Sequence, residues 1–229
     1  MKDRIVIREL SFKYEQEGPP ILSGLSMTAG PGEIIGITGL SGCGKSTFGC
    51  CVAGVIPKLL KGEMRGTIAL DGKAGIVFQD PDSQIFLPTV EDEIAFGPEN
   101  LCLPKEEIEA RIEELLSLTG MSALRRSNPA RLSGGEKQLI VFAAVLSMDP
   151  DIIVCDEVMA ALDESGKERI RSILLTLRLL GKTIILIEHD MASLSIADEC
   201  WQLLDGKLLK QNATNLIGNP ERNNEGKHQ

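Results

Sequence analysis

One stretch, Gly39-Leu-Ser-Gly-Cys-Gly-Lys-Ser-Thr47, limits what this chain can fold into more than any other part of it. It has the G-x-x-x-x-G-K-[ST] spacing of a loop that wraps a polyphosphate. An apolar run, Ile34–Thr38, precedes it like a buried strand, and a helix-permissive run follows it. Because a strand, this loop and a helix in that order are the context in which the motif binds phosphate, the sequence predicts a nucleoside triphosphate site.

The residue types in this loop suit a triphosphate for separate physical reasons. Glycines carry no Cβ and tolerate positive φ, so backbone N–H groups can approach the phosphates closely. The helix that starts near Lys45 directs the positive end of its dipole at the anion. Lys45 adds a charge for the β and γ phosphates, and the Ser46 hydroxyl can ligate Mg²⁺. The predicted nucleotide-binding residues of the loop are Gly39, Ser41, Gly42, Cys43, Gly44, Lys45, Ser46 and Thr47.

The composition is that of an ordinary soluble globular protein, with 43% hydrophobic and 25% charged residues in 229. A net charge of -9 argues against a nucleic-acid partner, which would need a basic face. No run approaches the roughly 18 consecutive apolar residues of a membrane span. The segment Met1–Ile7 has charges but lacks the apolar core of a secretory signal. The six cysteines are scattered without metal-ligand spacing, which predicts reduced thiols in a cytosolic protein.

Apolar strands alternate with helices along the chain, except for a helical block between Gln79 and Asp149. Strands are expected at 4–11, 25–28, 34–38, 66–72, 74–78, 151–156 and 183–187, with a terminal hairpin over 200–210. Helices are expected at 89–95, 104–120, 139–146 and 170–177. The pattern predicts an α/β fold of the P-loop NTPase type, with a RecA-like parallel sheet core and an N-terminal antiparallel β subdomain. We expect one domain over 1–218 with an inserted α-helical subdomain at about 81–149, followed by a disordered polar tail, 219–229.

A second apolar strand ends in two carboxylates, Asp156 and Glu157. Beside a phosphate loop, the first suits Mg²⁺, and the second can orient and polarise an attacking water.

A second helix start that could bind an anion lies at Leu132-Ser-Gly-Gly-Glu136. The Ser133 side chain and the amides of Gly134 and Gly135 form the candidate cradle. One nucleotide needs only one such cradle, so this one suggests a site completed by another subunit. The same residues also fit an ordinary Ser N-cap with Glu136 at N3, and both interpretations can hold together.

With these motifs in this order, the chain resembles the nucleotide-binding subunits of ATP-binding-cassette (ABC) transporters, from about residue 3 to 210. The resemblance implies that Tyr14 stacks on adenine; by itself this residue could equally be a hydrophobic cap on the first strand. Gln79 resembles the glutamine that reaches Mg²⁺ and the attacking water. Leu132–Glu136 resembles the LSGGQ signature, and 161–163, with Asp163, resembles the D-loop. His189 resembles the switch histidine that holds the γ-phosphate, although a histidine after a strand is more often structural.

Two further runs, Val77–Phe86 and Pro88–Pro98, resemble the ATPases of energy-coupling-factor importers, which take up vitamins or transition-metal ions. The chain also departs from the family pattern. Glu136 replaces the usual glutamine, Leu139 stands where many relatives have arginine, and Val158-Met159 replaces the common Pro-Thr. The Glu136 carboxylate would weaken a closed dimer if it met the other subunit's phosphates, or be harmless if it only caps its helix.

The resemblance implies a Mg²⁺-dependent ATPase that dimerises around two ATP molecules, as a homo- or heterodimer, and drives an integral-membrane importer. It would lie peripherally on the cytoplasmic face of the cell membrane, with the membrane subunit docking near Gln79–Pro98. Glu157, His189 and Gln79 are the expected catalytic residues, and Ser46, Gln79 and Asp156 the expected metal ligands. The alternatives are a non-transport ABC ATPase, acting as an assembly scaffold or in chromosome maintenance, and a small-molecule kinase that uses the same phosphate loop.

Overall fold

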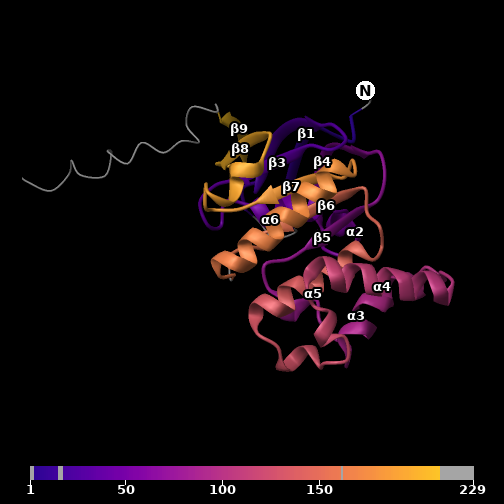
Figure 1. Ribbon diagram of the computed structural model, residues 1–229. Helices are drawn as coiled ribbons and strands as arrows, with labels where there is room; N and C mark the ends of the chain where they lie inside the picture. The colour runs from indigo at the N-terminus through magenta and orange to yellow at the C-terminus, as the bar shows by residue number, and fades with distance from the viewer. Residues whose placement is uncertain (1–2, 15–17, 161, 212–229) are drawn as a thin grey trace, which may run out of the picture.

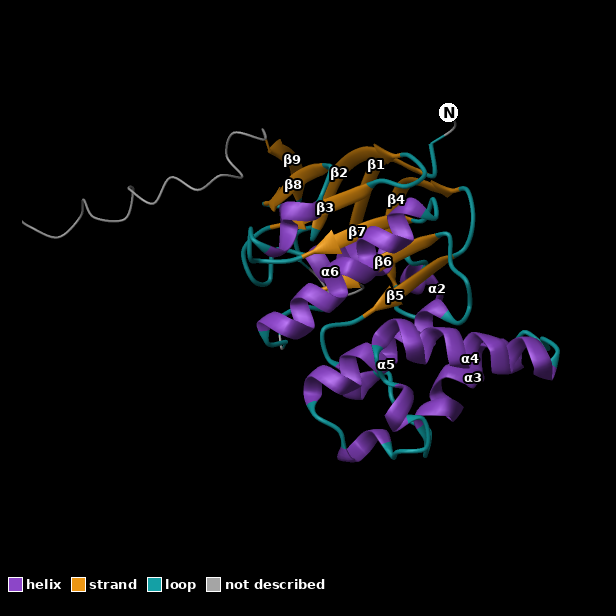
Figure 2. Cartoon of the chain, viewed as in Figure 1, coloured by secondary structure: helices purple, strands orange, loops and turns teal. Residues whose placement is uncertain are grey.

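The structure, a computed structural model, describes residues 3–14, 18–160 and 162–211 (Figures 1 and 2). Its centre is a sheet with the strand order β5-β6-β7-β3-β8-β9. Neighbouring strands in this sheet run parallel, except that β9 pairs antiparallel with β8. The strands are β3 (Ile34–Thr38), β5 (Ala74–Val77), β6 (Ile152–Asp156), β7 (Thr183–Ile187), β8 (Glu199–Leu204) and β9 (Lys207–Gln211).

The middle strands are mostly apolar, as expected where both faces of a sheet are covered. Every residue of β6 and β7 is buried. Ile170, Ile173, Leu174 and Leu177 of α6 (Glu164–Leu179) are buried in one cluster with Ile184 and Leu186. On the other face α1 (Lys45–Val52) buries Phe48 in a second cluster, with Ile185 and Ile187. The strand β7 thus alternates its side chains between two separate cores.

A second, antiparallel sheet covers the outer side of α1. It has the strand order β2-β1-β4, formed by β1 (Ile5–Tyr14), β2 (Leu22–Ala29) and β4 (Gly62–Leu70), with the short α2 (Val55–Lys58) before β4. Its inward residues, among them Ile7, Leu10 and Phe12, belong to the same cluster as Phe48. This sheet therefore clamps the helix that follows the phosphate loop.

The helices α3 (Val90–Asn100), α4 (Lys105–Thr119) and α5 (Gly134–Leu146) gather beyond the β5 edge of the central sheet (Figure 2). Their ends follow the predicted signals. The Thr89 side chain accepts a hydrogen bond from Asp92 N at 3.2 Å and caps α3. Gly120, at φ 69°, closes α4 in the left-handed conformation. Within the described ranges, no helix is long and apolar enough to cross a membrane.

The predicted fold class is confirmed, and most of the differences from the prediction are at element ends. β1 continues past Ser11 to Tyr14 because Phe12 pairs with Leu22 and Tyr14 with Gly62. These partners also start β2 and β4 earlier than predicted. The helix α3 runs on past Ala95 through Pro98, and the Asn100 side chain donates to Phe96 O at 2.7 Å. The short α2 was not predicted, and the tail 219–229 lies outside the described residues.

Candidate nucleotide and hydrolysis site

The candidate site lies where the parallel strands β3, β6 and β7 end side by side. Ile37 of β3 and Asp156 of β6 both lie opposite Ile187 of β7, so the loops that leave these strands start together. The loops enclose a hollow of about 320 Å³. Most of the predicted residues line it, and the lining residues are Ile21, Ser41, Gly42, Gly44, Lys45, Ser46, Thr47, Gln79, Glu157 and His189.

Two glycines in the phosphate loop have no room for a side chain. At Gly39, where φ is 154°, a Cβ would lie 2.5 Å from the backbone oxygen of Leu203. At Gly44, where φ is 104°, a Cβ would lie 2.7 Å from Ile21 Cγ2. Gly44 directly precedes α1, so its conformation sets how the chain enters the helix. The tight curl of this loop is therefore fixed by packing against β8 and the start of β2.

Glu157 stands between Lys45 and His189 at the mouth of β6. Its Oε1 is 3.6 Å from Lys45 Nζ, and its Oε2 is 2.7 Å from His189 Nε2. Glu157 and Lys45 are both buried, and Lys45 also donates to the carbonyl oxygens of Gly39 and Leu40. These three predicted side chains, which follow three different strands, thus form one contact chain. An acid held this way can take a proton from a water placed above it.

Asp156 offers a site for a hard cation. It is buried, and its Oδ1 has no hydrogen-bond partner among the described residues. Burial raises the pKa of the Asp156 carboxyl, while a hydrogen bond with Ser46 lowers it. A buried, unpaired carboxylate oxygen beside a hydroxyl is a donor set that fits Mg²⁺. Gln79 lies exposed just past β5 and lines the same hollow.

Tyr14 lies beside the phosphate loop at the end of β1. Its hydroxyl is 3.3 Å from Thr47 Oγ1, and its ring packs edge-on against Phe12, with centroids 4.9 Å apart. The first contact brings it to the loop, as adenine stacking requires, and the second fits a cap on the strand. Cys43 is partly buried inside the loop, where its sulfur packs close to Gly39.

The predicted signature and D-loop residues lie outside this hollow. Ser133 caps α5 in a capping box: its Oγ accepts from Glu136 N at 3.3 Å, and Glu136 Oε2 accepts from Ser133 N at 2.8 Å. The Ser133 hydroxyl also donates to the same carboxylate at 2.7 Å, and these bonds lower the pKa of Glu136. A Cβ at Gly135 would lie 3.2 Å from Leu162, which precedes Asp163, the N-cap of α6. These two loops therefore adjoin each other.

Sequence reasoning missed several residues that shape the site. Ile21 lines the hollow without any signal in the local pattern. Gln84 accepts from Phe78 N at 2.7 Å and donates to Ile76 O at 3.1 Å, while Gln138 of α5 donates to Phe78 O at 3.2 Å. These amides hold the end of β5, just before Gln79.

Glu188 is a further acid that the sequence analysis overlooked. It is buried, and its Oε1 accepts from Met159 N at 3.0 Å. Burial raises the pKa of the Glu188 carboxyl to about 7. A charged residue directly after five buried strand residues was the available signal.

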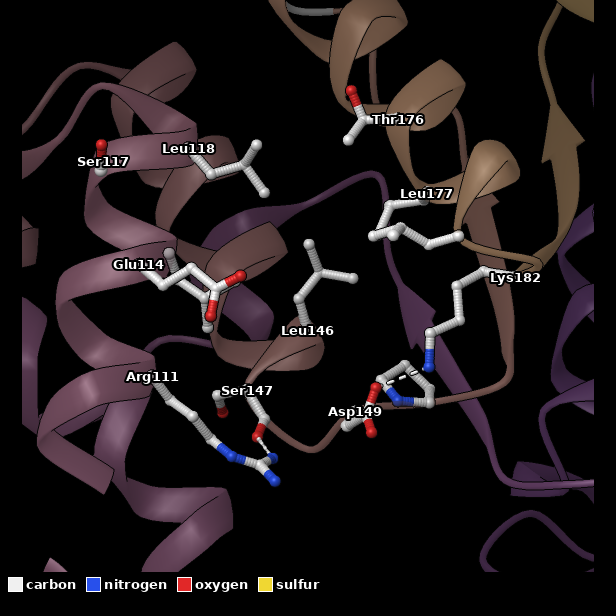
Figure 3. Close-up of a pocket in the computed structure, with 13 residues that line it drawn as sticks. Arg111, Glu114, Ser117, Leu118, Leu146, Ser147, Asp149, Thr176, Leu177 and Lys182 are labelled. Atoms are coloured by element: carbon white, nitrogen blue, oxygen red, sulfur yellow. Dashed lines mark hydrogen bonds and ion pairs between the residues drawn. The ribbon is translucent and has the colours of Figure 1, made fainter. Parts of the chain in front are cut away.

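A larger hollow, of about 530 Å³, lies at the opposite end of the sheet (Figure 3). An ion pair borders it, with Lys182 Nζ 2.5 Å from Asp149 Oδ1, and these residues precede β7 and β6. Arg111 of α4 donates to Ser147 O at 2.6 Å on its other side. Since the phosphate loop follows the far end of β3, this hollow is not part of the nucleotide site.

The fold and the loop define a phosphate-loop nucleotide-binding protein. The family profile described as "ABC transporter" matches residues 22–160, so the chain belongs to the ABC transporter family, and the predicted resemblance is confirmed. As a member of this family it binds ATP.

Individual relatives and a solved structure show which members of the family this chain is similar to. The energy-coupling factor transporter ATP-binding protein EcfA of Methanocaldococcus jannaschii is 37% identical, over 89% of this chain and 77% of that protein. The cobalt import ATP-binding protein CbiO of Syntrophus aciditrophicus is 34% identical over 93% and 79%. The structure of cbiO1 from Clostridium perfringens superposes with a TM-score of 0.80 at 32% identity, covering 93% of this chain and 89% of that one. By contrast, the chain spans 40% of a related ABC transporter ATP-binding protein of Methanosarcina mazei.

The loop geometry generates a prediction about Gly39. Gly39→Ala should weaken ATP binding by roughly 5–150-fold, because a side chain there strains the backbone and meets Leu203. Titration with a fluorescent ATP analogue measures the change.

Gly181→Ala is the matched control, since Gly181 also has positive φ (81°) but has open space and lies at the other end of the sheet. It should leave the affinity for ATP unchanged. Equal affinities for the Gly39 variant and the wild type would contradict the proposed fit of the loop around phosphate.

Proposed function

We propose that this chain is the ATP-hydrolysing subunit of an energy-coupling-factor type importer, working as one ABC ATPase domain over 1–218 with a helical subdomain at about 81–149. The observation that carries the proposal is the contact of Glu157 with both Lys45 and His189 at the mouth of the phosphate loop. The names of the EcfA and CbiO relatives favour transport over an assembly scaffold, chromosome maintenance or a kinase. The subunit would lie peripherally on the cytoplasmic face of the membrane.

The residues of the hollow have separate roles in this proposal. Backbone N–H groups of the loop wrap the phosphates, and Lys45 neutralises their charge. Ser46, Asp156 and Gln79 would hold Mg²⁺, which supplies further neutralisation of the phosphate oxygens when bound. Glu157 accepts a proton from the attacking water, and His189 stabilises charge on the transferred group. Tyr14 would stack on the adenine.

We infer that the site is completed by a second ABC ATPase subunit. Ser133, Gly134, Gly135 and Asp163 form a neighbouring pair of loops, yet none of them lines the hollow of its own chain. A helix N-terminus and its cap are suited to an anion, which a partner's nucleotide would bring. A pair of chains facing each other would complete two sites in this way.

The membrane subunit would dock on the segment that follows Gln79. Val90 and Ile94 are fully buried in the helical core, while Phe86 and Phe96 are 63% and 43% exposed. The two exposed rings pack edge to face, with centroids 4.9 Å apart. The buried Glu93 carboxylate accepts hydrogen bonds from the backbone N–H groups of Phe86 and Leu87, which fixes the segment that presents them. A rigid, exposed aromatic pair suits an amphipathic helix of a partner.

The imported substrate would be a vitamin or a transition-metal ion. One relative is named for cobalt import, and the solved neighbour is described as part of a cbiONQ complex. The substrate contacts themselves would lie in the membrane subunits.

The first test concerns the water-positioning acid. Glu157→Gln should retain ATP binding, since Lys45, Ser46 and Asp156 remain, but should lose hydrolysis by roughly 10²–10⁴-fold. It should also trap an ATP-dependent dimer. Steady-state phosphate release and gel filtration with ATP measure both effects. Near-normal turnover of the purified variant would refute the assignment.

The second test concerns the composite site. Ser133→Arg should bind ATP as a monomer but fail to dimerise, because the larger cation blocks the cradle. Mixed with Lys45→Ala chains, it should rebuild one intact site in each dimer and recover part of the ATPase activity. Each variant alone is the control. A mixture of folded chains that recovers no activity would count against a dimer that shares its sites.

The third test concerns docking. Phe86→Asp should leave the subunit folded and able to bind ATP, but association with the membrane component should fail because a charge replaces the exposed ring. Leu179→Asp is the control, since Leu179 is 87% exposed on α6, away from this segment. Pull-down with the membrane component compares the two. Unchanged capture by Phe86→Asp would place the docking surface elsewhere.

A further inference from the structure

Glu157 has a backbone conformation that residues other than glycine rarely adopt, with φ 54°. Its N–H donates to Ile187 O of β7 at 2.9 Å, which holds the residue on one side. Residue 158 is a valine, and no ring fixes its φ as the ring of a proline would. The turn after Glu157 therefore depends on hydrogen bonds for its shape. A strained conformation persists only where the surroundings fix it, so a second contact is needed beyond Glu157.

The side chain of Glu188 supplies that contact. It is 2% exposed, and its Oε1 accepts from Met159 N, two residues after Glu157, at 3.0 Å. The Glu188 N–H donates to Ile37 O of β3 at 3.1 Å. Glu188 therefore joins the ends of β3 and β7 to the turn that follows β6. Burying a carboxylate in a core is costly unless hydrogen bonds compensate, which argues that this acid serves the turn.

The same contact also governs His189. His189 follows Glu188 directly, and its Nε2 lies 2.7 Å from Glu157 Oε2. The buried Glu188 side chain thus links the backbone after Glu157 to the backbone of His189. Burial raises the pKa of Glu188, the Met159 N–H lowers it, and the charges of Glu157 and His189 oppose each other there. Glu188 is not among the residues that line the nucleotide hollow.

We propose that Glu188 is a positioning residue for ATP hydrolysis, which fixes the turn at Met159 and so holds the Glu157 carboxylate toward His189 and the reacting water. The proposal rests on the proposed ATPase function. Glu188 does not line the nucleotide hollow and would act through Glu157, so its loss should change turnover more than ATP binding.

The test compares three substitutions in the full chain. Glu188→Gln keeps an oxygen that can accept from Met159 N, whereas Glu188→Ala and Glu188→Leu remove it, the latter while filling the space. The Ala and Leu variants should lose roughly 10–100-fold in kcat, with KM for ATP within about threefold, since a buried donor is left without a partner. Glu188→Gln should restore most of the kcat. Amide hydrogen exchange at Met159 should quicken in the Ala and Leu variants and not in the Gln variant.

Thr183→Val is the matched control at the other end of β7, where it removes a buried hydroxyl bond to Gly30 O of 2.7 Å. It should leave kcat within about twofold, although it also disturbs a buried hydrogen bond. A folded Glu188→Leu chain with normal kcat would overturn the proposal, and so would a Gln variant as slow as the Leu variant. If the wild type hydrolyses no ATP, or hydrolyses it equally well with Glu157→Gln, the ATPase function fails instead. The Met159 exchange then still decides whether Glu188 holds the turn.

Discussion

The site depends on the alignment of three parallel strand ends. Ile37, Asp156 and Ile187 lie side by side in β3, β6 and β7, so the phosphate loop, Glu157 and His189 meet although they are far apart in the sequence. The alignment is held by hydrophobic cores on both faces of the sheet. One core lies under α1 and the antiparallel sheet, and the other includes α6 and the helices α3, α4 and α5. Because a one-residue slip in the pairing would turn every side chain of a strand to the opposite face, these cores also oppose such slips in register. Hydrophobic burial thus determines where the residues of the candidate site lie.

The sequence predicted the parts of this arrangement that arise from local patterns. Continuous apolar runs at 34–38, 152–156 and 183–187 indicated buried parallel strands, and the glycines and Lys45 of the loop indicated phosphate. It did not predict contacts that form only when distant segments meet. Ile21 lines the hollow because the chain directly before β2 passes beside Gly44. No periodicity in the sequence indicates this contact. Glu188 was overlooked because its partner, the Met159 N–H, lies in the turn after a different strand.

The departure at Glu136 has a physical meaning in the structure. Glu136 caps its helix, because its carboxylate accepts hydrogen bonds from both the N–H and the hydroxyl of Ser133. A glutamine could accept these bonds too, but without a full negative charge. If an anion from a partner chain approaches Ser133, the carboxylate opposes it by charge and competes for the same hydroxyl proton. The helix dipole at the start of α5 favours the anion and works against this repulsion. In a dimer of the proposed kind, the balance of these two effects would set how firmly the two chains close.

The end of β5 is the physical link between the hollow and the helices. A strand that stops in a loop leaves backbone groups that need partners. Here Gln84 satisfies Ile76 O and Phe78 N, and Gln138 satisfies Phe78 O. Gln138 belongs to α5, the helix whose first turn carries the Ser133 cap. A shift of α5 therefore strains the hydrogen bonds that place Gln79, and Gln84 lies in the same short segment as the exposed Phe86. One set of amide hydrogen bonds thus connects the end of β5 to α5 and to the segment that carries Phe86.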